Sequence, residues 1–290
     1  MVNIVTALAC SFLWAGVTIG GKMLSGALPS FAFAFLRYGL SALCLLPFVL
    51  MRKEKETLKI RYLPVIMFLG FTLVLVFNAL FFNAVYYSSA TSVSLIMATN
   101  PILTMLISAL LFRHIPNRYQ LLAFMLSFAG AVLVITEGKM GFSILKGSIG
   151  EFLMLLGVLF QIMYTLALKQ VSTHFSPLFL SFATMVSGIL FVFPFVANKE
   201  FVDVVMNITL KHWGIIGFIS FFGTALAIYL YSIVIKNMGP TRTSLIVFSA
   251  LPVFVMILAF IILGESISLW QLLGGTLVLS SLVIGLRHTR

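Results

Sequence analysis

The chain has 290 residues, of which 61% are hydrophobic and only 9% carry a charged side chain. Soluble domains are about half apolar and about one quarter charged, so this composition excludes a soluble globular protein. The formal net charge of +11 would otherwise suggest a nucleic-acid partner. Because the basic residues lie in short loops between apolar segments, we expect no nucleic-acid binding and infer instead that the partner is a lipid bilayer.

Apolar segments of about 18–23 residues follow one another along the chain, and each has the length that an α-helix needs to cross a bilayer core. Their continuous apolar character excludes barrel strands, in which apolar and polar residues alternate. In chain order they cover 2–22, 31–50, 63–83, 90–112, 119–136, 151–169, 177–197, 213–235, 242–263 and 269–287. The predicted fold is an all-α integral membrane protein with ten transmembrane helices.

The loops differ in charge on the two sides of this predicted bundle. Most Lys and Arg residues lie on one side, in loops such as 51–62 and 113–118. Acidic residues lie in loops or at helix ends on the other side: Glu137, Glu151, Glu200, Asp203 and Glu265. By the positive-inside rule the basic side, which carries both termini, is cytoplasmic. Short loops and tails favour a multi-pass protein of the bacterial inner (plasma) membrane.

The two halves of the chain resemble each other. Pro101 and Pro252 are 151 positions apart, and so are Gln120 and Gln271. We therefore predict one repeat over residues 1–136, a connecting loop over 137–150 and a second repeat over 151–290. Each repeat has five helices, an odd number, so the second repeat enters the membrane from the opposite side. Inverted repeats of this kind are typical of secondary transporters, whose binding sites lie near the midplane between the repeats.

The motifs also resemble those of a known family. Residues 83–93 read Asn-Ala-Val-Tyr-Tyr-Ser-Ser-Ala-Thr-Ser-Val and are followed by Asn100-Pro101, while Leu263-Gly264-Glu265 precedes Gln271. Together they resemble the drug/metabolite transporter superfamily, specifically proteins with two EamA-type repeats. The resemblance implies a secondary transporter of small metabolites, often an exporter, with amino-acid exporters among its characterised members. The first repeat departs from the pattern, with Arg113-His114 where a Gly-Glu pair is common.

Two prolines near the middle of predicted helices are candidate gating positions. Pro101 and Pro252 each lack an amide hydrogen, so each frees the carbonyl four residues earlier, at Met97 and Phe248. Freed carbonyls at the midplane can bind a substrate, and the nearby polar side chains of Thr99, Asn100 and Ser249 can assist. The alternative is a plain kink that shapes the bundle.

Arg37 is the only charge deep inside a predicted helix. It can bind a substrate carboxylate, or it can be structural, either snorkelling to the interface or bonding helix-end carbonyls. The structural interpretation is favoured, because the second helix is often peripheral in the family that the chain resembles.

Other polar and aromatic residues are expected to line a binding cavity. Asn78 corresponds to Tyr229 at the 151-residue offset, and both are polar at mid-helix, where polarity is costly unless it is used. Trp14 pairs roughly with Gln161, and Tyr164 lies on the same helix face as Gln161. The alternatives are hydrogen bonding between helices for Asn78 and Tyr229, and plain packing for the aromatic residues.

No Asp or Glu lies at the middle of any predicted helix, so the cavity is expected to be near neutral and rich in aromatic residues. We predict a transporter that moves amino acids or similar zwitterionic or neutral compounds by alternating access, as an exporter. The alternative is an uptake carrier or exchanger for a small cationic or neutral metabolite, such as a quaternary amine or a nucleoside. We expect no enzymatic activity, no cofactor and no metal, and a monomer or a homodimer.

Overall fold

The structure is a computed structural model that describes residues 2–52, 59–111, 118–136 and 149–287, and every regular element in these ranges is helical. The first half comprises α1 (Val2–Leu24), α2 (Ser30–Leu50), η1 (Ile60–Tyr62), α3 (Leu63–Gly70), η2 (Phe71–Phe77), α4 (Asn78–Tyr87), α5 (Ala90–Met97), α6 (Asn100–Leu111) and α7 (Arg118–Thr136). The second half comprises α9 (Ile149–Val171), α10 (Pro177–Val196), α11 (Lys199–Asn207), α12 (Leu210–Ser220), η3 (Phe221–Leu226), α13 (Ala227–Met238), α14 (Pro240–Leu258), η4 (Ala259–Leu263) and α15 (Leu269–Arg287).

The helices coincide with the predicted apolar segments within a few residues. In the described part of the chain, eight continuous helical segments are long and apolar enough to cross a membrane. The apolar stretches within α7 and α15 are shorter, at Leu121–Gly130 and Leu269–Ser281. The all-helical, multi-pass architecture is therefore confirmed, whereas the count of ten transmembrane helices stays a prediction. Most of the predicted connecting loop, residues 137–148, lies outside the described residues.

The segment 198–212, expected to be a loop, contains the short helix α11. The side chain of Asn198 caps this helix by accepting a hydrogen bond from the amide of Phe201 at 2.8 Å. The ring of Phe201 packs edge-on against Phe35 of α2, with 5.5 Å between ring centroids. A search of the sequence for long apolar runs does not find this helix, because α11 is short and amphipathic. Its stability depends on its own cap and on one anchored aromatic residue.

Equivalent helices of the two halves contain matching irregularities. The π-helices η2 and η3 begin at Phe71 and Phe221, which are 150 positions apart. Pro101, in contrast, has an effect that Pro252 lacks: α5 ends at Met97 and α6 begins at Asn100, whereas α14 runs unbroken through Pro252. The two halves therefore share an architecture, but the proline of the first half coincides with a break between helices and the proline of the second half does not.

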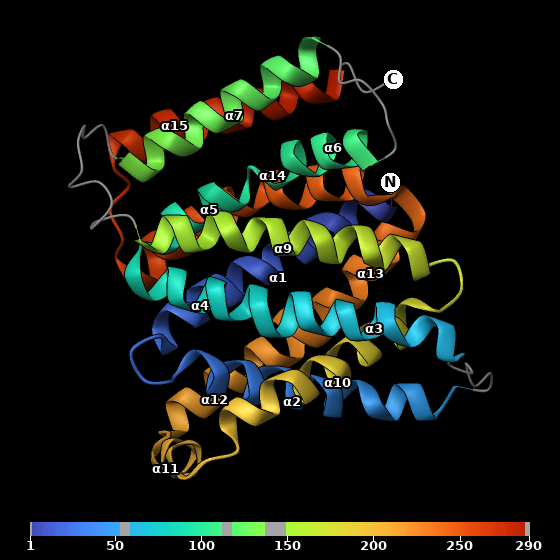
Figure 1. Ribbon diagram of the computed structural model, residues 1–290. Coiled ribbons are helices and arrows are strands. Elements are labelled where there is room, and N and C mark those ends of the chain that lie inside the picture. Colours follow the sequence, from blue (N-terminus) through green and yellow to red (C-terminus); the bar gives the residue numbers. More distant parts are fainter. Residues whose placement is uncertain (1, 53–58, 112–117, 137–148, 288–290) are drawn as a thin grey trace.

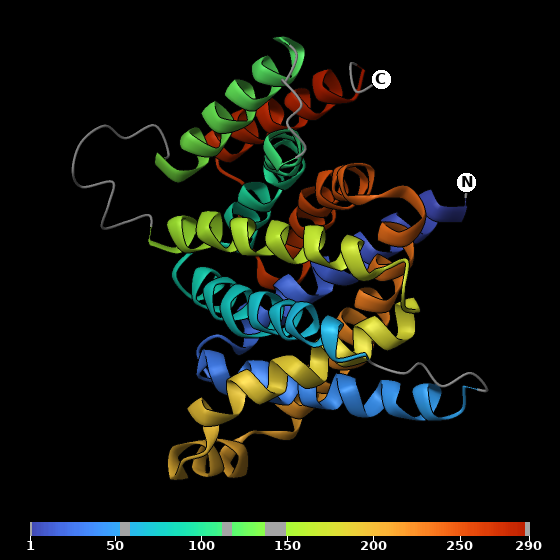
Figure 2. The same cartoon turned by 45° about the vertical axis from the view of Figure 1, so that its right-hand side comes forward.

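The helices lie in a stack, with α7 beside α15 at one edge and α2 beside α10 toward the other (Figures 1 and 2). Two glycines allow neighbouring helices to approach each other closely, one between α7 and α15 and one between α3 and α10. A Cβ atom at Gly130 of α7 would lie 2.6 Å from the carbonyl oxygen of Gly274 in α15. A Cβ atom at Gly70 of α3 would lie 2.4 Å from the amide nitrogen of Gly188 in α10.

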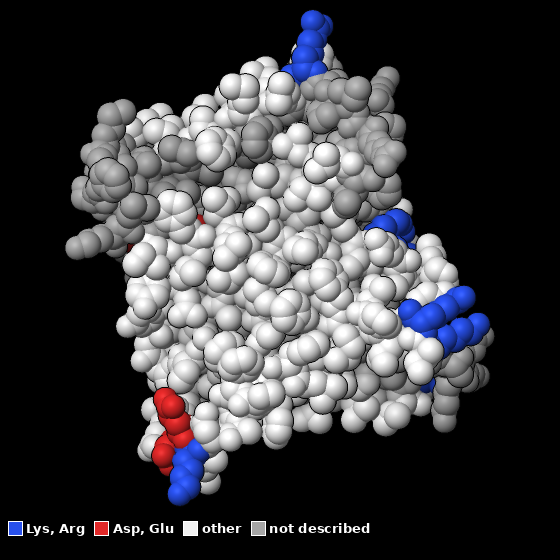
Figure 3. Space-filling model, viewed as in Figure 1, with Lys and Arg blue, Asp and Glu red and all other residues white. Residues whose placement is uncertain are grey.

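Charged side chains lie at the margins of the molecule and leave a broad uncharged surface between them in the view of Figure 3. The exposed Lys199, Glu200 and Asp203 of α11 mark one end, and the exposed Lys236 and Arg242 at the junction of α13 and α14 mark the other. The start of α1 and the end of α15 lie at this second end. An uncharged belt between two polar ends is the arrangement that a bilayer requires.

Candidate functional site

A cavity lies at the centre of the molecule, where both halves contribute walls. Residues from α1, α2, η2, α4 and α5 line it from the first half, and residues from α9, α13 and α14 line it from the second. Its empty space is about 430 Å³, of which about 30 Å³ can hold the centre of a water molecule. Ligand pockets typically measure about 300–1,000 Å³. The cavity is partly open and narrow in this conformation, so it would have to widen to hold a ligand larger than a few water molecules.

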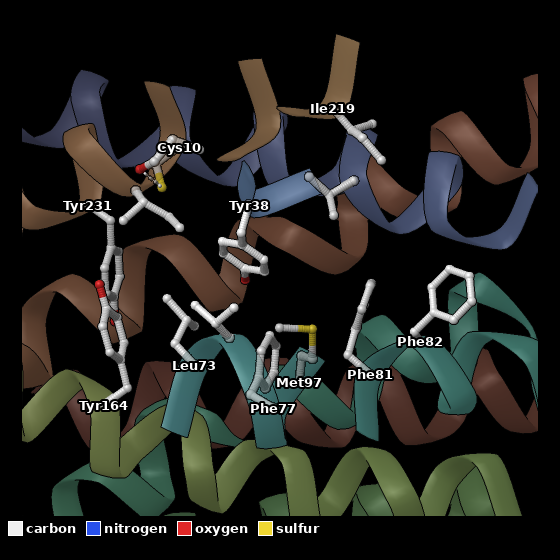
Figure 4. Packing of buried hydrophobic residues seen from close by; sticks show 14 of the residues in the cluster. Cys10, Tyr38, Leu73, Phe77, Phe81, Phe82, Met97, Tyr164, Ile219 and Tyr231 are labelled. Atoms are coloured by element: carbon white, nitrogen blue, oxygen red, sulfur yellow. Dashed lines mark hydrogen bonds between the residues drawn. The ribbon is translucent and has the colours of Figure 1, made fainter. Parts of the chain in front are cut away.

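The walls are mainly aromatic and aliphatic. Figure 4 shows the ring of Tyr38 directed from α2 toward Leu73, Phe77 and Met97 across the buried interior. Trp14 of α1 lies with its ring centroid 4.9 Å from that of Tyr231 and 5.7 Å from that of Phe248. Trp14 therefore joins the first half of the chain to α13 and α14 through aromatic contacts.

Arg37 reaches the cavity from the middle of α2 and is only 4% exposed. Its Nε donates a hydrogen bond to Oγ1 of Thr224 at 2.6 Å, and its Nη1 donates one to Oδ1 of Asn78 at 3.1 Å. The guanidinium carbon lies 5.0 Å from the ring centroid of Tyr38. The side chain thus points inward, and it neither snorkels to the interface nor bonds helix-end carbonyls.

The two partners of Arg37 are placed by the paired π-helices. Thr224 lies within η3, and Asn78 directly follows η2. The wider π turn rotates the following residues relative to a regular α-helix, and such turns are frequent at functional sites. Asn78 is fully buried, and its Nδ2 makes no hydrogen bond within the described residues. Arg37 therefore connects the irregular turns of both halves.

Gln161 is the second polar residue of the cavity wall. It lies on α9, is 1% exposed, and neither polar atom of its amide makes a hydrogen bond within the described residues, although the amide lies near the Tyr231 hydroxyl. Tyr164, three residues further on, is fully buried and stacks on Tyr231 with 6.5 Å between ring centroids. Buried amides almost always have hydrogen-bond partners, so Gln161 is an exception to the usual pattern.

The structure brings only some of the predicted site residues to this cavity. Trp14, Arg37 and Gln161 line it, Asn78 adjoins it through Arg37, and Tyr164 reaches it through Tyr231. The other predicted side chains lie outside the lining residues: Thr99, Asn100, Tyr229 and Ser249.

Among those side chains, hydroxyl groups mainly bond their own helices. Thr99 donates to the carbonyl of Ile96 at 2.8 Å, and Ser249 donates to the carbonyl of Leu245. The buried Asn100 accepts a hydrogen bond from Thr104 at 3.0 Å, while its Nδ2 has no partner within the described residues. These contacts stabilise the local backbone around the break before Pro101.

The two prolines lie close to the cavity without lining it. Met97, whose carbonyl Pro101 frees, and Leu251, which precedes Pro252, both have side chains in the cavity wall. The break between α5 and α6 therefore places irregular backbone beside the cavity, whereas α14 presents continuous helix there.

Polar and aromatic residues near the cavity that were not singled out from the sequence include Thr18 and Tyr38 in its wall, Thr224 as a partner of Arg37, and Tyr231 beside Trp14. The offset of 151 residues places Tyr229 opposite Asn78, whereas the residue that directly follows η3, as Asn78 directly follows η2, is Ala227. The signal that could have revealed Tyr38 is its position next to Arg37 in a predicted helix.

A separate group of polar residues closes the end of the bundle that carries α11. We define this Lys22 network as Lys22, Ser88, Glu151, Glu265 and Gln271 with their partners. Nζ of Lys22 donates hydrogen bonds to the carbonyls of Val85 at 2.7 Å and Ser88 at 2.6 Å, at the end of α4. Because carbonyls at a helix C-terminus carry partial negative charge, a Lys ammonium group stabilises them there.

Glu265 performs the complementary task at the start of α5. Its carboxylate accepts hydrogen bonds from the amides of Ala90 at 2.9 Å and Thr91 at 3.2 Å, and from Oγ1 of Thr91 at 3.0 Å. A carboxylate that binds free amides at a helix N-terminus is favourably placed in the field of the helix dipole.

Gln271 and Glu151 complete the network. Nε2 of Gln271 donates hydrogen bonds to the hydroxyls of Ser89 at 3.1 Å and Ser92 at 2.8 Å, while the hydroxyl of Ser88 donates to the carboxylate of Glu151. The turn between α4 and α5 is thus tied to α1, α9 and α15, so the network closes this end of the bundle.

Comparison with known proteins identifies related sequences for both halves of the chain. Residues 1–136 and 148–286 each match the EamA-like transporter family. The chain is 30% identical over 248 residues to "Uncharacterized transporter YyaM" of Bacillus subtilis (strain 168), which covers 84% of this chain and 80% of that protein. It is 26% identical over 281 residues to "Uncharacterized transporter YetK" of the same organism, covering 96% and 84% of the two chains.

A solved structure shares the fold. A chain titled only "Crystal structure of protein" superposes with a TM-score of 0.69 at 14% sequence identity, covering 99% of this chain and 98% of that chain. An "Uncharacterized transporter" of Archaeoglobus fulgidus is 24% identical over 275 residues, covering 94% and 93% of the two chains. The similarity thus extends over nearly the whole length, and it includes both halves that line the cavity.

Proposed function

The chain belongs to the EamA-like transporter family, and on this premise we propose that it exports small metabolites by alternating access. The proposed substrates are amino acids or similar zwitterionic or neutral compounds. The proposed setting is the bacterial inner membrane, with both termini in the cytoplasm and the protein a monomer or homodimer. The proposed architecture has ten transmembrane helices, in two inverted repeats over 1–136 and 151–290 that the loop 137–150 joins.

The observation that carries this proposal is the central cavity that both halves line. A binding site between repeats is accessible from alternate sides when one repeat rocks against the other. Aromatic contacts of Trp14 with Tyr231 and Phe248, together with the hydrogen bond of Arg37 to Thr224, cross this interface. A rocking motion has to change these contacts, and the substrate is proposed to bind among them.

Within this proposal the site residues have distinct roles. Trp14 forms an aromatic wall, Arg37 and Gln161 present polar groups to the substrate, and Asn78 and Tyr164 support them. Pro101 is proposed as a gating position because α5 and α6 separate there, and Pro252 as its counterpart in the second repeat. Thr99, Asn100, Tyr229 and Ser249 lie outside the cavity lining and are proposed to contact substrate only in a more open conformation.

The alternative is an uptake carrier or exchanger for a small cationic or neutral metabolite. The direction of net flux follows from the gradients, so uptake of a neutral compound such as a nucleoside uses the same site. A cation such as a quaternary amine fits less well, because the guanidinium of Arg37 would repel it in a cavity of low dielectric constant. A cationic substrate would therefore favour the alternative, whereas a neutral substrate is compatible with both proposals.

Counterflow into proteoliposomes tests the proposed function. Vesicles loaded with one unlabelled compound should accumulate the same labelled compound only when the protein carries it. The panel comprises amino acids, a quaternary amine, a nucleoside and a sugar phosphate. Leu190→Ala, at a lipid-facing position that is 60% exposed, serves as the matched control variant. Counterflow of amino acids supports the proposal, whereas the absence of counterflow with every compound contradicts it.

A further inference from the structure

We propose that the cavity selects its substrate by a carboxylate group, which Arg37 and Gln161 bind, and that an ammonium group is not required. The substrate class is a small monocarboxylate with an apolar or aromatic body, of which apolar amino acids are one subset. This inference rests on the proposed transport function and narrows its substrate.

The charge balance of the cavity supports an anionic group. Arg37 is buried, and within the described residues no Asp or Glu forms an ion pair with it. Hydroxyl and amide oxygens solvate the guanidinium but bring no negative charge. A buried charge without a counter-ion is strongly disfavoured. A substrate carboxylate would supply the missing charge each time the site is occupied.

The hydrogen-bond geometry leaves a free donor edge on Arg37. Thr224 occupies Nε and Asn78 occupies Nη1, while Nη2 makes no hydrogen bond within the described residues. The two occupied donors hold the planar guanidinium in one orientation, so its unoccupied edge is already aligned. Guanidinium groups bind carboxylates through parallel N–H donors, and such charge-assisted bonds are stronger than neutral ones.

Gln161 provides a second donor on the opposite half of the chain. Its amide is buried in the wall of the same cavity and has no hydrogen-bond partner within the described residues. An amide group can donate to a carboxylate or accept from an ammonium group. Since Arg37 and Gln161 belong to different halves, a carboxylate held by both would join the two repeats at the moment of binding.

Apart from the hydroxyl groups of Thr18 and Tyr38, the rest of the wall matches an apolar body. Trp14, Leu73, Phe77, Phe81, Ile228 and Leu251 line the cavity. Among the described residues that line it, no carboxylate is present to pair with an ammonium group. The aromatic faces can attract a cation, but the buried positive charge of Arg37 opposes it. The amino group of an amino acid is therefore tolerated without being recognised.

A matched trio of ligands tests this inference directly. The three ligands share a phenylethyl body: 3-phenylpropanoate carries the carboxylate alone, phenylalanine carries carboxylate and ammonium, and 2-phenylethylamine carries the ammonium alone. Binding is measured by competition with counterflow in proteoliposomes and by thermal shift of the purified protein. The two carboxylates should bind with similar affinity, and the amine should bind about 10- to 100-fold more weakly.

Substitutions of Arg37 separate charge from structure. Arg37→Gln should weaken binding of both carboxylates by about 10- to 100-fold and leave the amine unaffected or bound more tightly. Arg37→Lys, which retains the charge, should recover part of the affinity, and it remains informative if Arg37→Gln fails to fold. Thr224→Val removes the partner of Nε and keeps the guanidinium, so it should reduce carboxylate affinity much less.

The outcomes distinguish this inference from the proposed function. Equal or tighter binding of the amine, or full carboxylate affinity in Arg37→Gln, would overturn the carboxylate assignment and leave the transport function standing. Counterflow of a nucleoside or quaternary amine without any carboxylate counterflow would do the same. Failure of every compound in the wider panel to exchange would instead contradict the transport function itself.

Discussion

The Lys22 network and the central cavity are both buried polar regions, but they differ in how their polar atoms are satisfied. In the network, the ammonium of Lys22 and the carboxylate of Glu265 bond the exposed ends of α4 and α5. In the cavity, the amide of Gln161 and the Nη2 of Arg37 make no hydrogen bond within the described residues. In our proposal the network holds the structure together, whereas the unpaired groups of the cavity are those that a ligand would bind.

The largest expected effect on stability is that of Glu265→Ala. The substitution removes three hydrogen-bond acceptor contacts at the start of α5, so the free energy of unfolding should fall by about 2–3 kcal/mol. Thermal unfolding in detergent measures it. Thr276→Ala is the control, since that exposed hydroxyl bonds only carbonyls of its own helix. If Glu265→Ala left the melting temperature unchanged while abolishing substrate binding, the network would be functional rather than structural.

Lys22→Met is the second test of the network. The carbonyls of Val85 and Ser88 lose their charged donor, and the free energy of unfolding should fall by about 1–2 kcal/mol. Substrate affinity should stay within about twofold of the original, because Lys22 does not line the cavity. Lys199→Met, at an exposed position on α11, controls for the loss of one positive charge. A large loss of affinity with normal stability would contradict the division between the two regions.

Gln161→Leu should raise stability and lower transport, which is the opposite of what we expect for substitutions in the Lys22 network. An unpaired buried amide is replaced by an apolar group of similar size, so the free energy of unfolding should rise by about 1 kcal/mol. Counterflow should fall by about tenfold, because a hydrogen bond to substrate is worth about 1–1.5 kcal/mol. Gln170→Leu, at an exposed position on the same helix, is the matched control. Lower stability with intact transport would show that Gln161 is a structural residue.

The smallest expected effect is that of pH on substrate affinity. Within the described residues, no His, Asp or Glu lines the cavity, so no group there changes its charge near neutral pH. For a substrate whose own charge is constant, affinity between about pH 6 and pH 8 should vary by less than twofold. A larger change that disappears in Glu151→Gln or Glu265→Gln would assign proton coupling to the Lys22 network.

Much of the fold could be predicted because bilayer constraints are visible locally. An apolar run of the right length predicts a spanning helix wherever it occurs, and charges mark the ends. The predicted segment 151–169 and the helix α9 illustrate this agreement. The helix α11 was missed because its stability depends on a cap and on the contact of Phe201 with α2, which no apolar run reveals.

The cavity could be predicted only in part. Trp14 and Gln161 were found because a polar or bulky aromatic residue deep in an apolar helix is conspicuous. Tyr231 was not among the predicted residues, because a repeat offset compares positions between helices and does not show which face of α13 meets Trp14. Similarly, Pro101 and Pro252 look equivalent in the sequence, but only the first coincides with a break between helices.

The sequence by itself determined that a lipid bilayer surrounds this protein, where its helices lie in the chain, and that its two halves are related. Each of these features follows from the local order of apolar and charged residues. Only the tertiary structure decided which side of each helix faces the cavity. It turned Arg37 toward Thr224 and Asn78, left the amide of Gln161 without a hydrogen bond among the described residues, and brought Lys22 and Glu265 to the ends of α4 and α5. Such pairings depend on helix register and on contacts between residues far apart in the chain, which no local pattern specifies.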